Sequence, residues 1–110
     1  MTSNFEQRVG QNEALFREIN ERIEAGRWPG DESEQLAFRC ECSMLGCNHL
    51  LELTPAAYER VRANPRRFLL APGHEIAGVE VVVEREASYL VVEKVGEAGR
   101  VAESTDPRED

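Results

Sequence analysis

The sequence predicts an α+β protein in which an N-terminal helix precedes a small antiparallel β domain with one short helix. Three observations lead to this fold class. Apolar residues recur at helical spacing up to residue 26, which predicts one amphipathic helix. Short alternating or β-branched segments follow between residues 35 and 95, which is typical of antiparallel strands joined by turns. All three cysteines fall between residues 40 and 47, which indicates a shared local role.

The helix predicted over residues 1–26 begins with capping-box spacing between Ser3 and Glu6. Its apolar positions form a heptad seam that is interrupted by Asn12. The seam consists of Phe5, Val9, Phe16, Ile19 and Ile23. Either the seam packs on the protein's own domain, or it binds a protein partner or a second copy, with Asn12 fixing the register. Residues 27–34 are predicted to be a linker.

Residues 35–95 form the predicted α+β domain. Strands are predicted in QLAFRCEC, HLLELT, RFLLA, GVEVVVE and YLVVEKV, and the last two flank REAS as a hairpin. A short helix follows the second strand, because Thr54 is a good N-cap and Pro55 suits the first helical position. Few apolar residues occur after residue 95, so residues 96–110 are predicted to be a disordered acidic tail.

Length and charge limit the functions that the chain can have. It has 110 residues and a net charge of −8, which predicts one domain with a modest core that a metal ion would help to stabilise. A phosphate backbone would repel the chain as a whole, so general binding to nucleic acid or anionic membranes is not expected. The sequence has neither a signal-peptide pattern nor a long apolar run. We therefore expect a cytoplasmic protein with reduced thiols.

The cysteines predict a bound zinc ion (Zn2+) that stabilises the β domain. A structural zinc site takes four ligands, mostly thiolates and imidazoles, in a tetrahedron. Residues two apart on a strand share a face, so Cys40 and Cys42 can both reach one ion, and the following turn returns Cys47 toward them. His49 and His74 are the two candidates for the fourth ligand. Spacing favours His49, which shares the strand parity of Cys47, whereas His74 would close a longer loop and contribute more to folding.

The stretch FRCECSMLGCNHLLELTPAAYERVRANPRRFLLAPGHE resembles a family of small, uncharacterised bacterial proteins found in actinobacterial genomes. The shared features are a C-x-C strand with a third cysteine, LT before a Y-E-x-V-R helix, and an R-F strand ending in P-G-H-E. NEALFREINERIE and VVEKVGEAG also resemble that family, so the similarity extends over most of residues 10–99. The resemblance implies no particular activity. It implies metal ligands at Cys40, Cys42, Cys47 and His74. The loop CSMLGC differs from the acidic loops of that family, which keeps His49 as a competing fourth ligand.

Three thiolates and one imidazole would fill the coordination sphere of zinc and leave no open position for a reactive water. We therefore expect a zinc finger-like structural site in a protein-interaction or adaptor module, with the N-terminal helix as its binding surface. Catalysis is not the predicted function, although a metal-dependent enzyme with an open site is one alternative. A zinc-thiolate redox switch is a second alternative, and nucleic-acid binding through a basic patch is a third. The patch consists of Arg60, Arg62, Arg66 and Arg67.

Overall fold

The computed structural model describes residues 4–26, 34–44 and 46–108, and its fold is α+β, as the sequence predicts. The helices are α1 (Asn4–Ala25), α2 (Pro55–Arg62) and α3 (Gly96–Ser104). The strands are β1 (Leu36–Arg39), β2 (Leu50–Leu53), β3 (Arg67–Leu70), β4 (Glu80–Arg85) and β5 (Leu90–Lys94). Most of the predicted linker over residues 27–34 lies outside the described residues.

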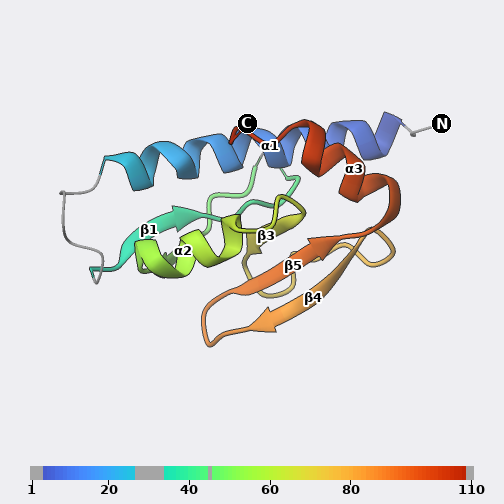
Figure 1. The fold of residues 1–110 in the computed structure, drawn as a ribbon. Coiled ribbons are helices and arrows are strands. Elements are labelled where there is room, and N and C mark those ends of the chain that lie inside the picture. The colour runs from blue at the N-terminus through green and yellow to red at the C-terminus, as the bar shows by residue number, and fades with distance from the viewer. Residues whose placement is uncertain (1–3, 27–33, 45, 109–110) are drawn as a thin grey trace.

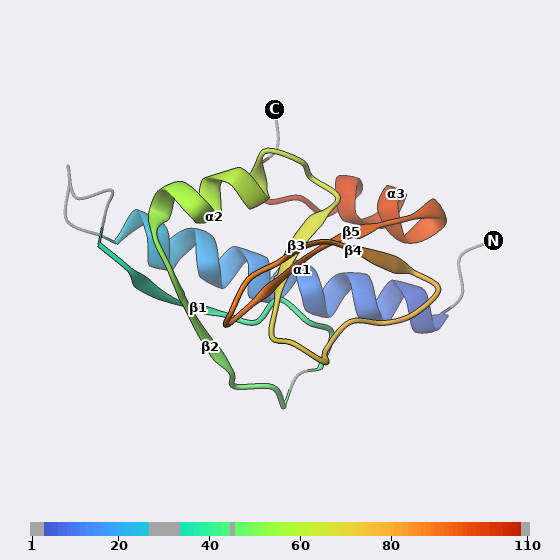
Figure 2. The ribbon, with the colours of Figure 1, turned by 90° about the horizontal axis from the view of Figure 1, so that it is seen from below.

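The strands form two antiparallel sheets on one side of α1 (Figure 1). One sheet pairs β1 with β2, and the other has the order β3-β5-β4. Seen from below, α1 passes behind both sheets, and α3 lies beside it (Figure 2). The Glu41 N–H, just beyond β1, donates to the Leu69 carbonyl of β3 at 2.7 Å, which connects the two sheets.

α1 packs on the protein's own domain, where it contacts β1 and α3. Within the predicted seam, Val9 and Phe16 are buried, and Ile23 packs against the core. Asn12 contacts the protein's own chain, where its Nδ2 donates to the Ser43 carbonyl at 2.7 Å. The apolar seam of α1 therefore packs against the protein's own core. The opposite face of α1 points away from that core.

α2 begins as the sequence predicts and packs on β3 and, through Tyr58, on β1. The Thr54 hydroxyl accepts a hydrogen bond from the Ala57 N–H at 3.1 Å, and Pro55 occupies the first turn. Tyr58, on the inner side of α2, stacks on Phe38 of β1 with 4.5 Å between the ring centroids. Both aromatic side chains are fully buried, so this pair fixes α2 against the strand that leads into the cysteines.

The C-terminal segment corrects the prediction of a disordered tail over residues 96–110. Residues 96–104 form α3, which packs against α1 and β5. The chain turns from β5 into α3 at Gly96, whose φ of 57° favours glycine. α3 approaches α1 closely at Gly10, where a Cβ atom would lie 2.3 Å from Cγ1 of Val101. The low apolar content of this segment was misleading, because close backbone packing and polar contacts hold it in place.

Two buried arginines account for much of that polar attachment. Arg17 of α1 is fully buried and donates to the carbonyl oxygens of Pro65 at 2.7 Å and Arg67 at 3.0 Å. Its guanidinium also lies 3.8 Å from the Asp106 carboxylate. Arg62 of α2 forms an ion pair with the same carboxylate. These contacts join α1, α2 and the C-terminal segment in one folded unit, which therefore extends beyond its predicted C-terminal boundary.

A second group of buried charges lies between α1 and the three-stranded sheet. Lys94 Nζ donates to Glu13 Oε2 at 2.5 Å and also to the Glu80 carboxylate, and all three residues are buried. Burial raises the pKa of Glu13 from an ordinary 4.5 to about 7; Lys94 opposes this rise, and the Glu80 charge adds to it. One ammonium thus faces two carboxyl groups, and Glu13 can take up a proton near neutral pH.

We expect the contribution of Glu13 to stability to fall as the pH rises. A carboxyl group whose pKa is raised by folding stabilises the folded state fully below its unfolded pKa, near 4.5, and this contribution is lost as the pH rises through about 7. The free energy of unfolding of the wild type, relative to Glu13→Gln, should drop by on the order of 2 kcal/mol between about pH 5 and 8. Urea unfolding measures this difference, with Glu18→Gln, at an exposed position of α1, as the control. Parallel pH profiles of wild type and Glu13→Gln would contradict the expectation.

Candidate metal centre

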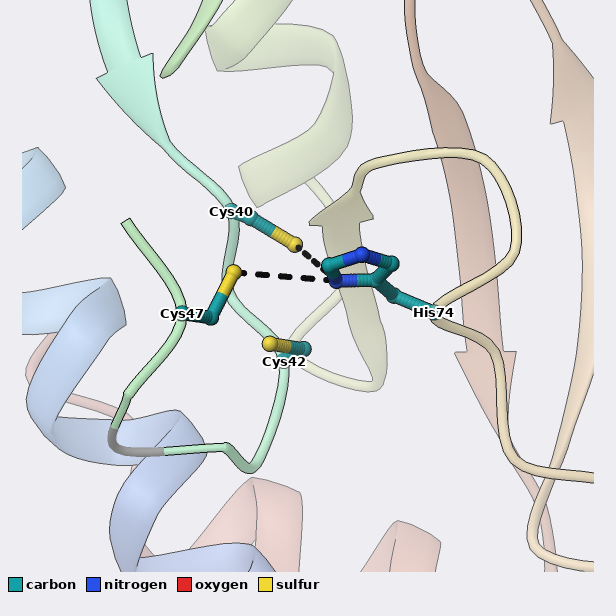
Figure 3. A group of neighbouring side chains, drawn as sticks. All are labelled: Cys40, Cys42, Cys47 and His74. Atoms are coloured by element: carbon teal, nitrogen blue, oxygen red, sulfur yellow. Dashed lines mark hydrogen bonds between the residues drawn. The ribbon is translucent and has the colours of Figure 1, made fainter. Parts of the chain in front are cut away.

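Three thiols and one imidazole converge where the two sheets meet (Figure 3). Their ligand atoms all lie within 4.8 Å of one another, and the residues are Cys40, Cys42, Cys47 and His74. His74 Nδ1 is 3.6 Å from the Sγ atoms of both Cys40 and Cys47. A tetrahedral ion with bonds of about 2.3 Å to sulfur and about 2.0 Å to nitrogen requires a sulfur–nitrogen separation of about 3.5 Å. The group could therefore hold one metal ion with little movement of these side chains.

The cysteines lie in the segment that joins β1 to β2. The Cys40 N–H donates to the His49 carbonyl at 3.1 Å, which continues the antiparallel pairing one residue beyond the two strands. The Cys47 N–H donates to the Met44 carbonyl at 3.0 Å. The Arg39 guanidinium donates to the Cys47 carbonyl at 2.8 Å. These bonds hold the returning chain beside the outgoing one, so Cys47 comes back to face the first two cysteines.

The turn after β3 supplies the histidine. The His74 N–H donates to the Ala71 carbonyl at 3.1 Å, and Gly73 within this turn has a φ of 89°. A side chain would strain that conformation, so the turn favours glycine. The Ala71 N–H donates to Cys40 Sγ at 3.1 Å. The end of β3 thus contributes both a candidate ligand and a hydrogen bond to a candidate thiolate.

The charge of the site depends on whether a cation is bound. Burial raises the pKa of the Cys40 thiol far above its usual range, and the neighbouring cysteines raise it further. Burial also raises the pKa of Cys42. The main-chain N–H groups of Ala71 and Met44 donate to these sulfurs and oppose the rise. Without a cation the two buried thiols keep their protons, whereas a divalent metal ion would offset the charge of their thiolates.

Glu41, between the two buried cysteines, anchors the ligand segment in the core. Its side chain is fully buried and accepts hydrogen bonds from the Tyr58 hydroxyl at 2.7 Å, Asn20 Nδ2 at 2.8 Å and the Leu69 N–H at 3.0 Å. It thereby connects the segment to α2, α1 and β3. Glu41 was not among the predicted site residues. Its position between two predicted zinc ligands could have indicated it. A carboxylate in a buried segment requires hydrogen-bond or charged partners, and these fix the segment.

Two asparagines of α1 also support the ligand segment. Asn20 Oδ1 accepts from the Arg39 N–H at 2.7 Å, and its Nδ2 donates to the Arg39 carbonyl at 2.8 Å. Asn12, which interrupts the apolar seam, donates from its Nδ2 to the Ser43 carbonyl. The two asparagines thus fix the main chain on either side of Cys40 and Cys42. This role explains why polar residues occupy the inner face of α1.

The structure brings four of the five candidate ligands together and leaves His49 outside the group. His49 is exposed, and its ring lies edge-on to His74 with 4.8 Å between the centroids. Sequence spacing favours His49 over His74 as the fourth ligand, because spacing reports only on local geometry. His74 is 34 positions from Cys40 and approaches it because the segment after β1 is hydrogen-bonded to β3 and its end, from the Glu41 N–H to the Leu69 carbonyl and from the Ala71 N–H to Cys40 Sγ. The four residues are those that the family resemblance implied.

Carboxylates largely neutralise the predicted basic patch. Three of its four arginines form ion pairs within the protein. The pairs are Arg62–Glu21 at 2.7 Å, Arg66–Glu103 at 3.0 Å and Arg67–Glu93 at 3.0 Å. Arg60 is exposed. These ion pairs reduce the positive potential that a phosphate backbone would meet, so the geometry gives no support to nucleic-acid binding.

Fold and site define a small α+β protein with a Cys3His group that could hold a metal ion. Comparison of the chain with protein-family models, curated proteins and solved structures finds no match in any of the three. The family resemblance therefore stays a prediction. Among the described residues, none of the helices combines the length and the apolar character that a membrane crossing demands.

Proposed function

We propose that Cys40, Cys42, Cys47 and His74 bind one zinc ion and that this ion is structural. The observation that carries the proposal is the convergence of four donors, from the β1–β2 connection and from the turn after β3, to within 4.8 Å of one another, with His74 Nδ1 3.6 Å from two of the sulfurs. Three thiolates and one imidazole are a donor set typical of structural zinc. The ion would join the β1–β2 connection to the turn after β3, and so would fix the relative position of the two sheets.

The donor set supports a structural role over a catalytic one. A catalytic zinc ion keeps one position open for water or substrate, whereas four protein ligands fill the sphere. Glu41 is the carboxylate between the ligands, and it is buried and accepts three hydrogen bonds from protein groups. It is therefore not available as a general base for a metal-bound water. We accordingly propose a binding module without a reaction of its own.

Native mass spectrometry of protein purified without chelator tests the ligand set. We expect one zinc ion per chain in the wild type and in His49→Ala, because His49 contributes no ligand atom to the group. His49→Ala/His74→Ala, which has no histidine left to complete the sphere, should bind none. Zinc lost from His49→Ala, or zinc retained in the double variant, would show that the ligand set is wrong. A wild-type protein without metal would contradict the proposal as a whole.

We further propose that the module binds a protein partner, or a second copy of itself, through the outward face of α1. Leu15 is the position at which to test this surface, because it is a large apolar residue of α1 and is 48% exposed. Leu15→Asp should weaken self-association or partner capture about tenfold or more without loss of zinc. Light scattering coupled to size-exclusion chromatography measures the self-association. Phe16→Asp, at the adjacent buried position, should instead unfold the protein. Association that persists unchanged in Leu15→Asp would exclude this surface.

A further inference from the structure

His49 lies beside the metal group without belonging to it. The Cys40 N–H donates to the His49 carbonyl, so these two residues face each other across the β1–β2 connection. Residues that face each other in an antiparallel pair direct their side chains to the same side. The His49 ring also rests edge-on against His74, with 4.8 Å between the centroids. Main-chain pairing and ring contact independently place this imidazole next to the candidate ligands.

Cys47 is the thiol most open to loss. Cys40 and Cys42 are only 1% and 3% exposed, and the sulfur of each accepts a main-chain N–H. Cys47 is half-buried and lies on the same short segment as His49, two residues before it. A reagent that arrives from solvent therefore reaches Cys47 before the other two. The position that its sulfur would vacate is 3.6 Å from His74 Nδ1, and the His49 ring contacts the ring of the same histidine.

We infer that His49 is a replacement ligand for Cys47. When the Cys47 thiolate is lost, a short movement of the segment before β2 lets the His49 imidazole complete the coordination sphere. The site then changes from Cys3His to Cys2His2, and both are ordinary ligand sets for structural zinc. The formal charge of the zinc site rises from −1 to 0. This inference rests on the proposed zinc binding and adds a means by which the fold keeps its ion after damage to one thiol.

Competitive zinc titration against a chromophoric chelator tests the replacement. We expect His49→Ala to bind zinc like the wild type, and Cys47→Ala to bind about 10- to 100-fold more weakly. Cys47→Ala/His49→Ala should lose at least a further hundredfold, because no protein group remains to complete the sphere. Cys42→Ala provides the matched control. The zinc affinities of Cys42→Ala and Cys42→Ala/His49→Ala should differ less than threefold.

Cobalt substitution identifies the ligands directly. In Cys47→Ala the thiolate-to-cobalt absorption should fall to about two thirds of its wild-type intensity, and the d–d bands should keep the strength of a tetrahedral site. In the double variant the d–d bands should weaken or disappear. Equal affinities and equal spectra for Cys47→Ala with and without His49 would overturn the inference. A wild type that binds neither zinc nor cobalt would instead overturn the proposed zinc site, so the two failures are distinguishable.

A second measurement uses the folded, zinc-loaded chain and does not depend on the folding of a Cys47 variant. N-ethylmaleimide adds to a thiolate through its carbon–carbon double bond; a sulfur–carbon bond forms, and water protonates the neighbouring carbon. Native mass spectrometry then follows zinc in the singly modified species. The wild type should keep its ion after one addition at Cys47, whereas His49→Ala should release it. Release at the same stage from both proteins would also overturn the inference.

Discussion

Cys40→Ser should unfold the domain as well as abolish metal binding. Cys40 Sγ faces His74 Nδ1 and accepts the Ala71 N–H, so it lies at the junction between the two sheets. Structural zinc contributes about 10 kcal/mol or more in small domains, whereas a whole domain is stable by only about 5–15 kcal/mol. A chain of 110 residues with a modest core has little reserve against a loss of that size. We therefore expect no cooperative thermal transition in this variant.

Circular dichroism with temperature, on wild type and Cys40→Ser, measures this effect. Removal of metal from the wild type by a strong chelator should produce the same loss, and added zinc should reverse it. Ser43→Ala is the control in the same segment, because only the main-chain carbonyl of Ser43 takes part in the contact with α1. A Cys40→Ser protein that melts like the wild type would show that the ion, if bound, does not hold the fold.

Glu41→Ala should destabilise the zinc-loaded protein by about 3–5 kcal/mol. The substitution leaves the Tyr58 hydroxyl, the Asn20 amide and the Leu69 N–H buried without their acceptor. Each unsatisfied donor costs about 1–3 kcal/mol, and part of that cost is relieved by entering water. Because Glu41 is flanked by two candidate ligands, the loss should also weaken zinc binding. Urea unfolding at fixed excess zinc separates the stability effect from loss of the ion.

Glu52→Ala is the matched control, since Glu52 is an exposed carboxylate on β2 in the same hairpin. It should change the free energy of unfolding by less than about 0.5 kcal/mol. A double-mutant cycle with Tyr58→Phe sharpens the test. The Tyr58→Phe change should cost less in the Glu41→Ala background than in the wild type, by about 1 kcal/mol or more. Additive effects of the two substitutions would contradict a shared hydrogen bond network.

Local chemistry explains which parts of the fold could be predicted from sequence. The cap at Thr54, the proline after it and the alternation in LLEL depend on neighbouring residues, and the structure has α2 and β2 where these patterns occur. The three cysteines were recognisable as a group because they lie close together along the chain. Each of these features is set within a few residues, so tertiary structure was not required to find it.

The remaining features depend on tertiary contacts. The choice between His49 and His74 is made by the contact between the Cys40–Glu41 segment and β3, which no spacing rule contains. α3 has few apolar residues, and it is held by a close approach to α1 at Gly10 and by Arg17. A glycine and an arginine on a predicted helix do not indicate that another helix packs on them.

Zinc K-edge X-ray absorption on the wild-type protein, purified without chelator, tests the central proposal most directly. A single tetrahedral zinc ion held by Cys40, Cys42, Cys47 and His74 should give three sulfur neighbours at about 2.3 Å and one nitrogen neighbour at about 2.0 Å. A first shell of nitrogen and oxygen only, or a shell with a water in place of the imidazole, would contradict the closed structural site.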